Sequence, residues 1–416
     1  MFGVATSVVL AACGSTSSAV SAGSSTTVAK ASTPGSKSPV VFHAVLSETG
    51  AGSFLGTREA KSLEALAKSV NAEGGIDGHP VQMDIVDNRT SPSLAVSTVT
   101  SWIGQGVQFV LNGSQVATDV AVDALATSKG PFIYDLSPGV HPKAGSMVFS
   151  AGVSTQAQVD TLLTYLKAKG LTHIAVLTSS DASGTDGLNQ LKAALATSQF
   201  SSMKMVANET FDPSAVSVAS QLSVIKSANP QAIVVWTIGT PFGTVLNGMS
   251  SLGMLGIPVA TSSGNDPYSE LNHFKAVLPK TLLENVAPLN LQSSYLPTGA
   301  VKNTVSQFRQ KITAIGGHPS DAWGLSWDAA QLLIRALKKL GVNATAKQIL
   351  PYMESLKNVW ACLESTIRAR LTIEALLSAA FTSRSGTELA SFQCRNRVVP
   401  QFRQDEAANE YTIWTS

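Results

Sequence analysis

The chain has 416 residues, of which 44% are hydrophobic and 13% are charged, and its formal net charge is +2. A chain of this length can form two lobes, each with its own core. The near-neutral charge balance, with no basic stripe carrying interleaved aromatic residues, excludes the usual footprint of a nucleic-acid-binding protein.

The N-terminal segment predicts export. An apolar run over residues 4–12 is too short to span a bilayer and fits the hydrophobic region of a signal peptide. It ends in Leu-Ala-Ala-Cys, which resembles a bacterial lipobox with Cys13 as the lipidated residue. No Lys or Arg precedes the run, which favours a translation start upstream of Met1, and the alternative is a chance cysteine behind an apolar stretch. We predict a signal peptide over residues 1–13 and an extracytoplasmic protein anchored to the cell membrane by an N-terminal lipid.

Residues 14–38 predict a flexible tether. Ser, Thr, Ala and Gly dominate this segment, so it cannot bury enough apolar surface to fold. No cysteine occurs between Gly14 and Ala361. The fold therefore needs no disulfide framework there, and it has no cysteine-based metal site there.

After the tether, apolar runs rich in β-branched residues alternate with helical patterns in two series. The first series predicts strands over residues 40–46, 81–86, 107–111 and 131–134, with helices over 56–71, from 91 onward and over 118–128. The second predicts strands over 173–177, 203–206, 233–236 and 257–260, with helices over 156–169, 187–197, 216–228 and 242–252. Long helices follow over 302–315 and 321–340. We predict an α/β fold with two Rossmann-like lobes, each with a parallel sheet covered by helices.

Six polar loops follow the predicted strands. Parallel sheets place such loops together at the carboxyl ends of their strands, where ligands bind. Amides at helix N-termini and hydroxyl groups suit carboxylates, although Ser, Gly and Asn are also ordinary turn and cap residues. The loops are 47–50, 112–115, 135–137, 178–181, 237–239 and 262–265.

Catalytic signatures are absent from the sequence. It contains no Gly-x-Ser-x-Gly elbow, no phosphate-binding loop and no His-Glu-x-x-His motif. Its six histidines are scattered without metal-ligand spacing. Asp181 and Asp186 are close enough in sequence to form a carboxylate pair, which a loop beside a ligand cleft explains equally well. We therefore predict no enzyme activity, no cofactor and no metal.

Residues 71–80, Asn-Ala-Glu-Gly-Gly-Ile-Asp-Gly-His-Pro, are the most specific feature of the chain. Their glycines end a helix and turn the chain tightly into an edge strand. The segment resembles the Asn-x-x-Gly-Gly-Ile-x-Gly motif of the branched-chain amino-acid and amide-type substrate-binding proteins of ABC transporters, within the type I periplasmic binding protein family. Supporting matches are Glu48-Thr49-Gly50, Asn112-Gly113-Ser114, residues 181–187 and Ser326-Trp327-Asp328-Ala329-Ala330.

This resemblance implies a type I periplasmic binding protein fold, with two lobes joined by three crossovers that close on a ligand like a hinge. The expected lobe I covers residues 40–152 and 290–341, and the expected lobe II covers 153–289 and 342–358. Family members bind the carboxylate of an amino acid through hydroxyls and backbone amides of lobe I. That role would fall on Ser114, Leu136 and Ser137, with Phe54 or Leu55 contacting the ligand's side chain.

Lobe II matches the family only in part. Ser183 stands where the family often has Tyr, and Ser263 or Gly264 stands near the position of its acid, so Asp181 or Asp266 could substitute. The ligand is therefore an amino acid, an amide, a short peptide-like solute or an aromatic acid, and a flat one would suit Trp236 and Thr237. The candidate ligand-binding residues are Phe54, Leu55, Ser114, Gln115, Asp135, Leu136, Ser137, Asp181, Ser183, Trp236, Thr237, Ser263 and Asn265.

The C-terminal segment has a different composition. The first 357 residues contain 19 Lys and 4 Arg, whereas the last 59 contain no Lys and 6 Arg. Two of the three cysteines, Cys362 and Cys394, lie here. We hypothesise that residues 359–416 are translated from a shifted reading frame, with a divergent but authentic extension as the alternative.

Taken together, these features predict a monomeric solute-binding lipoprotein. It would capture an amino acid or related small molecule and deliver it to ABC permease subunits in the membrane. A ligand-sensing receptor module on the same fold is one alternative. A hydrolase using Asp181 or Asp186 is another.

Overall fold

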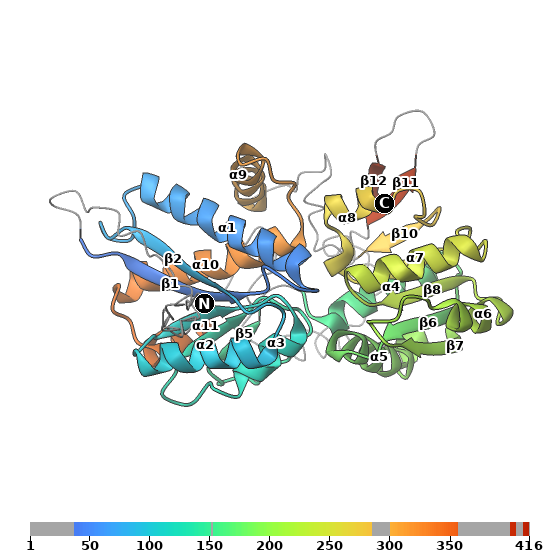
Figure 1. The fold of residues 1–416 in the computed structure, drawn as a ribbon, viewed down its shortest axis with the longest axis horizontal. Helices are drawn as coiled ribbons and strands as arrows, with labels where there is room; N and C mark the ends of the chain where they lie inside the picture. The colour runs from blue at the N-terminus through green and yellow to red at the C-terminus, as the bar shows by residue number, and fades with distance from the viewer. Residues whose placement is uncertain (1–36, 151–152, 285–299, 357–399, 405–410, 416) are drawn as a thin grey trace, which may run out of the picture. The chain divides into compact units, whose positions relative to one another are not determined.

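The structure is a computed structural model that describes residues 37–150, 153–284, 300–356, 400–404 and 411–415. These residues form two parallel sheets, each with its own covering helices (Figure 1). The predicted signal peptide, Cys13 and most of the predicted tether lie outside the described residues.

The first sheet is entirely parallel and has the strand order β2-β1-β3-β4-β5. Alternate residues of each strand face opposite sides. Phe42 and Ala44 of β1 therefore join one apolar cluster, while Val45 joins the other. The strands are β1 (Val40–Leu46), β2 (Val81–Asp87), β3 (Phe109–Asn112), β4 (Phe132–Asp135) and β5 (Val148–Ser150).

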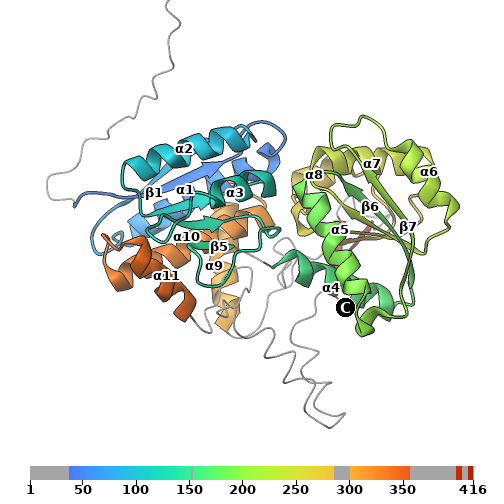
Figure 2. The same ribbon diagram turned by 90° about the horizontal axis from the view of Figure 1, so that it is seen from below.

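Helices cover both faces of this sheet, which together form lobe I (Figure 2). One face packs against α1 (Ser53–Ala72), α9 (Ala300–Ala314), α10 (Asp321–Leu340) and α11 (Ala346–Ser355), and the other against α2 (Pro92–Gly104) and α3 (Val116–Asp123). Local sequence sets several helix starts: Ser91 caps α2 ahead of Pro92, and Thr345 forms a capping box with Gln348.

The second sheet has the order β12-β11-β10-β9-β8-β6-β7. Its five strands from β10 to β7 pair in parallel, while β11 and β12 are antiparallel. The strands are β6 (His173–Ser179), β7 (Lys204–Phe211), β8 (Ala232–Trp236), β9 (Val259–Thr261), β10 (Leu282–Glu284), β11 (Pro400–Gln404) and β12 (Tyr411–Thr415).

Lobe II is this sheet with its own helices. One face packs against α4 (Thr155–Ala168), α5 (Ala182–Leu195) and the short 3₁₀ helix η1 (Ser198–Phe200), and the other against α6 (Ala219–Ser227) and α7 (Thr240–Ser251). The 3₁₀ turn η2 (Ser263–Asn265) and helix α8 (Tyr268–His273) follow β9. Every core cluster consists mainly of fully buried aliphatic and aromatic side chains, each contributing about 1.5–3 kcal/mol by leaving water.

The predicted fold class is confirmed, because two parallel sheets with helices on both faces are present. One boundary differs from the sequence-based prediction. Residues 342–358 were expected in lobe II, yet α11 packs in the lobe I core through Ile349 and Met353. The chain therefore changes lobe between β5 and α4, between β10 and α9, and between α11 and β11.

The segment of unusual composition reaches lobe II, since β11 pairs with β10 and β12 pairs with β11. Most of it, including Cys362 and Cys394, lies outside the described residues. The shifted-frame hypothesis for residues 359–416 therefore stays a prediction. In the described part of the chain, no helix combines the length and apolarity needed to cross a bilayer.

Close packing between α5 and β8 gives a test of lobe II. A Cβ added at Gly187 would overlap the ring of Trp236, which is 2% exposed. We expect Gly187→Ala to lower the free energy of unfolding by about 1–3 kcal/mol, because the core cannot absorb the added methyl group without strain. Urea denaturation monitored by circular dichroism measures this change.

The control variant is Gly104→Ala at the end of α2, where an added Cβ has no neighbour within 4 Å. It should unfold at the same urea concentration as the wild type or at a slightly higher one, because Ala favours a helix more than Gly does. Equal stability of the Gly187→Ala and wild-type proteins would show that the described packing of Trp236 is wrong.

Candidate functional site

The six polar loops lie at the carboxyl ends of strands in the two sheets. Loops 47–50, 112–115 and 135–137 follow β1, β3 and β4, and we call them the lobe I rim. Loops 178–181, 237–239 and 262–265 follow β6, β8 and β9, and we call them the lobe II rim. Each set of three strands pairs in parallel with its neighbours, so each rim occupies one sheet edge.

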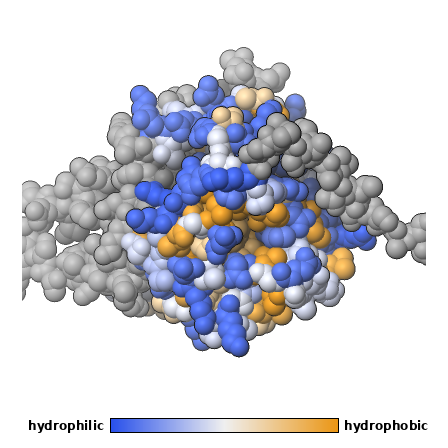
Figure 3. Space-filling model, turned by 90° about the vertical axis from the view of Figure 1, so that its left-hand side faces the viewer, coloured by the Kyte–Doolittle hydropathy of each residue, from blue (hydrophilic) through white to orange (hydrophobic). Residues whose placement is uncertain are grey.

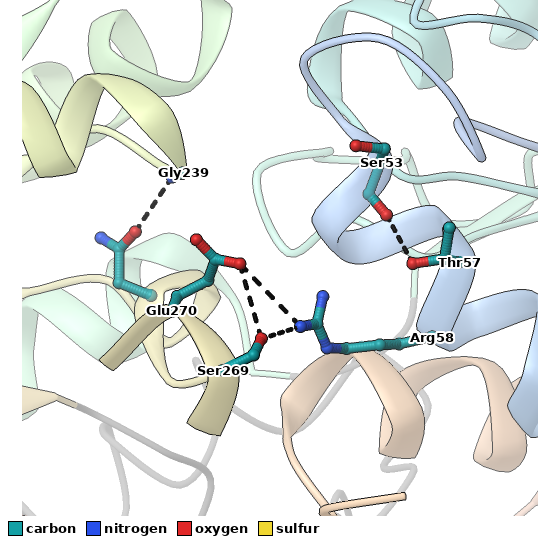
Figure 4. Close-up of polar contacts among 7 residues, drawn as sticks. Ser53, Thr57, Arg58, Gly239, Ser269 and Glu270 are labelled. Atoms are coloured by element: carbon teal, nitrogen blue, oxygen red, sulfur yellow. Dashed lines mark hydrogen bonds and ion pairs between the residues drawn. The ribbon is translucent and has the colours of Figure 1, made fainter. Parts of the chain in front are cut away.

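The first two turns of α1, in lobe I, contact lobe II. Phe54 lies against Gly239, since a Cβ added at Gly239 would overlap its ring. Arg58, one turn further along α1, donates a hydrogen bond to the hydroxyl of Ser269. Its Nη2 also lies 4.0 Å from Oε1 of Glu270. Figure 4 shows Arg58 extended toward these two residues of α8.

Two further contacts join the lobes. Nε2 of His141, in the loop after β4, lies 2.8 Å from Oδ1 of Asp186 in α5. At the start of α10, the carboxylate of Asp321 accepts a hydrogen bond from the Ser263 hydroxyl at 2.6 Å. The Asp321 amide donates to Asp266 at 3.0 Å. Polar contacts therefore join the two lobes at three places.

The two predicted rim serines of lobe I rest on buried acids. The Ser114 hydroxyl hydrogen-bonds the carboxyl of Glu59 and accepts from the Ser47 amide at 3.2 Å. The Ser137 amide donates to Oδ2 of Asp119 at 3.2 Å, and its hydroxyl also hydrogen-bonds that carboxyl. The polar groups predicted to meet a solute are thus already linked to carboxyls inside the lobe.

The other predicted ligand-binding residues of lobe I differ in how far they are buried. Phe54 is half-buried, whereas Leu55 and Leu136 are buried. The Leu136 amide donates to the Asn112 carbonyl at 2.7 Å, so this N–H already has a hydrogen-bond acceptor within the protein. The side chain of Gln115 is partly exposed and lies beside Gly52.

Asp135 was predicted to contact a solute, but its side chain lies inside lobe I. It is fully buried, accepts a hydrogen bond from Nδ2 of Asn112 at 2.8 Å, and hydrogen-bonds with the carboxyl of Asp123. Two carboxyls can hydrogen-bond only when one of them holds a proton. Burial raises the pKa of Asp135 well above its usual range, and the neighbouring acids Asp119 and Asp123 raise it further. Asp135 is therefore an interior group.

Asp181 and Trp236 of lobe II also have structural roles. Oδ1 of Asp181 accepts from the Gly184 amide at 2.8 Å and from the Ser179 hydroxyl at 2.9 Å, so Asp181 caps α5. Trp236 belongs to the lobe II core and packs on Gly187, and its contact with a flat ligand stays a prediction.

Other predicted residues of lobe II hold the rim in shape. The Asn265 side chain accepts from the Gly239 amide at 3.1 Å and donates to the Thr237 carbonyl at 2.8 Å. The Thr237 hydroxyl is buried and has no hydrogen-bond partner in the described part of the chain. Ser263 is buried against Asp321, and Ser183 is partly exposed in the first turn of α5. The Thr237 hydroxyl is therefore a buried group of the lobe II rim that could hydrogen-bond a solute.

Buried carboxyls are the feature that the sequence-based prediction missed. Glu59 shares one face of α1 with Leu63 and Leu66, and an acid on an otherwise apolar helical face was a visible signal. Burial raises the pKa of Glu59 to about 8, although the Ser114 hydrogen bond lowers it in part. The Glu59 carboxyl is therefore mostly protonated near neutral pH.

A second group of buried acids joins β10, the lobe II rim and α10. It consists of Glu284, Asp266 and Asp321, and burial raises the pKa of all three, that of Asp321 to about 6. Both carboxyl oxygens of Glu284 are buried without a hydrogen-bond partner among the described residues. No cluster of His, Cys, Asp or Glu in those residues is arranged to hold a metal ion.

A hollow of about 400 Å³ lies away from the paired rims. It is lined by Glu48, Glu64, Ala67, Met83 and Ile85, at the edge formed by β2 and α1. Figure 3 shows one face of the molecule, with hydrophobic residues gathered in its middle and hydrophilic residues around them. Only Glu48 belongs to a rim loop, so this hollow is not the candidate site.

The buried acids predict a stability that falls as pH rises. Their pKa values are raised on folding, so the native state binds more protons than the unfolded state. Their stabilising contribution is complete below about pH 4, where the unfolded carboxyls also hold their protons. It is lost as pH rises through about 6 for Asp321 and about 8 for Glu59. We expect the melting temperature to decline between pH 5 and pH 8.5, measured by differential scanning calorimetry.

Asp321→Asn is the matched variant, because its amide is neutral at every pH. It should flatten the part of the decline near pH 6, while the exposed-site variant Glu64→Gln should leave the decline unchanged. A wild-type melting temperature that stays constant or rises across this range would contradict the protonated state of these carboxyls.

The sequence matches the family model of periplasmic binding proteins over residues 39–373. A 91-residue segment, 22% of this chain, is 29% identical to the Leu/Ile/Val-binding protein homolog 1 of Brucella abortus and of Brucella suis. This segment spans 24% of each relative, so the match covers about a quarter of the length of these curated proteins.

Several solved structures share the fold. A type 1 periplasmic binding protein from Bordetella pertussis has a TM-score of 0.71 at 17% identity, covering 91% of this chain and 100% of that one. The substrate-binding protein LivJ from Streptococcus pneumoniae, in complex with isoleucine, has a TM-score of 0.68 at 16% identity with the same coverage. A fatty acid ABC transporter substrate-binding protein from Thermomonospora curvata has a TM-score of 0.70 at 16% identity, covering 91% and 92%. With the family model spanning both sheets, the chain belongs to the periplasmic binding protein family.

Proposed function

We propose that this protein is an extracytoplasmic solute-binding lipoprotein that captures an amino acid or a related small molecule for an ABC importer. The observation that carries the proposal is the meeting of two loop-lined sheet edges, with Phe54 of lobe I against Gly239 of lobe II. A solute between the rims would contact both lobes and therefore favour their closed arrangement.

The lobe I rim is the proposed seat of a carboxylate. Ser114 and Ser137 supply hydroxyls, and loop 112–115 leads into the N-terminus of α3, whose amides favour negative charge. Phe54 is half-buried at the junction and offers an apolar surface to an aliphatic or aromatic side chain. On lobe II, the Thr237 hydroxyl is available to hydrogen-bond the solute.

The solutes named for the similar structures fit this arrangement. Isoleucine and fatty acids both carry a carboxylate and an aliphatic chain. We infer that the solute of this protein has the same two parts, one for the lobe I serines and one for Phe54.

A receptor module that senses a solute would use the same site and differ only in its protein partner. A hydrolase is disfavoured by the two carboxylates that it would need. Asp181 caps α5. Hydrogen bonds from His141, Thr155 and Gln190 outweigh the effect of burial and hold the pKa of Asp186 below its usual value, which makes it a weak base.

A thermal-shift screen tests solute capture. The panel contains branched-chain and other amino acids, their amides, aromatic acids and short fatty acids. A solute at 100 times its dissociation constant stabilises the native state by about 2.7 kcal/mol, so a true ligand raises the melting temperature measurably. Recovery of the solute unchanged after incubation separates binding from hydrolysis.

Phe54→Ala identifies the site. It removes the ring that meets Gly239, and we expect it to weaken binding about tenfold, or about 1.4 kcal/mol, by isothermal titration calorimetry. Val216→Ala is the control, because Val216 is 95% exposed in lobe II. Equal affinities of the two variants would place the solute elsewhere, and a panel with no binder would refute capture of these solutes.

The proposed anchor has a separate test. Metabolic labelling with a fatty acid should modify Cys13, so we expect Cys13→Ser to abolish the label and release the protein from the membrane fraction. Cys394→Ser, which alters a cysteine of the C-terminal segment, should keep the label. A label that persists in Cys13→Ser would show that the lipobox assignment is wrong.

A further inference from the structure

The carboxyl of Glu59 lies directly behind the lobe I rim. Glu59 is 1% exposed on α1, and its Oε2 is hydrogen-bonded to the Ser114 hydroxyl. A Cβ added at Gly113 would lie only 3.2 Å from the same oxygen. The carboxyl therefore touches the loop whose hydroxyl is the proposed contact for a solute's carboxylate.

The charged groups around Glu59 include no cation bonded to it. Asp119 on α3 interacts with it electrostatically, and Asp119 in turn interacts with Asp123 and Asp135. Arg58, its neighbour on α1, is directed to Ser269 and Glu270 instead. Among the described residues, no Lys, Arg or His hydrogen-bonds or pairs with Glu59. Ionisation of Glu59 would therefore leave a buried charge without a counter-ion.

Helix α10 packs on α1 and also brings no cation to Glu59. The charged residues in the N-terminal half of α10 are Asp321, which bonds to Ser263 and Asp266, and Asp328. The sheet side is closed by the Ser47 amide and by Leu136 beside Gly113. The buried surroundings of Glu59, which bring no cation to it, therefore favour the protonated form of its carboxyl.

The hydrogen-bond count at Ser114 depends on this proton. The hydroxyl oxygen has two lone pairs and one proton, and one lone pair accepts from the Ser47 amide. When Glu59 is protonated, it can donate to the other lone pair, which leaves the hydroxyl proton of Ser114 for a solute. When Glu59 is ionised, it takes that proton for itself and places a negative charge behind the rim.

We propose that Glu59 is a specificity-determining residue, whose carboxyl proton turns the Ser114 hydroxyl toward the solute, so that the lobe I rim binds a carboxylate only together with one proton on Glu59. This inference rests on the proposed function, because it requires a solute carboxylate at Ser114. No bond is made or broken apart from the transfer of this proton between water and the Glu59 carboxyl.

The test is the pH profile of affinity, with L-leucine as the probe. Isothermal titration calorimetry between pH 6 and pH 9 should show a nearly constant affinity up to about pH 7, a loss of about twofold at about pH 8, where Glu59 titrates, and a loss of about tenfold by pH 9. Titrations at pH 9 in two buffers of different ionisation enthalpy measure the protons bound with each solute. Wild type should take up about 0.9 proton more than Glu59→Gln.

Glu59→Gln separates this role from a structural one. The glutamine amide can donate to Ser114 at every pH, so the variant should bind L-leucine at pH 6 and lose the pH dependence that Glu59 causes. Glu64→Gln, an exposed site on the same helix, should keep the wild-type profile. Circular dichroism confirms that both variants are folded.

The outcomes are distinguishable. If the wild type and Glu59→Gln share one pH profile, or if folded Glu59→Gln fails to bind, the role of the Glu59 proton is refuted while solute capture stands. If the only binders in the panel lack a carboxylate, the proposal is also refuted. If neither L-leucine nor any panel solute binds at pH 6, the proposed function itself fails.

Discussion

Parallel strand pairing is the constraint on which this molecule depends. In each lobe it directs the carboxyl ends of three neighbouring strands to one edge, and the chain must leave that edge through polar loops before entering the next helix. The glycine at 239 shows how closely the two edges approach, because the ring of Phe54 occupies the space that a side chain there would need. Binding groups from distant parts of the sequence thus come to one junction.

Loops at such a junction carry polar groups that must be hydrogen-bonded when they are buried. In lobe I, buried acids provide these hydrogen bonds. Glu59 is hydrogen-bonded to the Ser114 hydroxyl, and Asp119 accepts a hydrogen bond from the Ser137 amide. A carboxyl can serve in an apolar interior when it is neutral, because the cost of burial falls on the charged form. The protonation of these acids therefore links the stability of the fold to the behaviour of the rim.

Elements whose pattern is strong and local were predictable from the sequence. The strand over Val40–Leu46 and the helix over Asp321–Leu340 have the predicted bounds. Their periodicity is unbroken, and residues that cap or break such elements stand at their ends. Strands β5 and β10 have three residues each and leave too little pattern to detect. The lobe of α11 depends on which distant core accepts Ile349 and Met353. At the site, the loops were predictable, but the inward direction of Trp236 and Asp135 was not, because tertiary packing decides it.

The most direct test of the account is a crystal structure of the protein grown with the solute that gives the largest thermal shift. We predict that the solute lies at the junction of the lobes beside Phe54, with its carboxylate at hydrogen-bond distance, about 2.7 Å, from the Ser114 hydroxyl. A solute bound in the hollow beside β2, or one whose carboxylate faces the acids of lobe II, would contradict it.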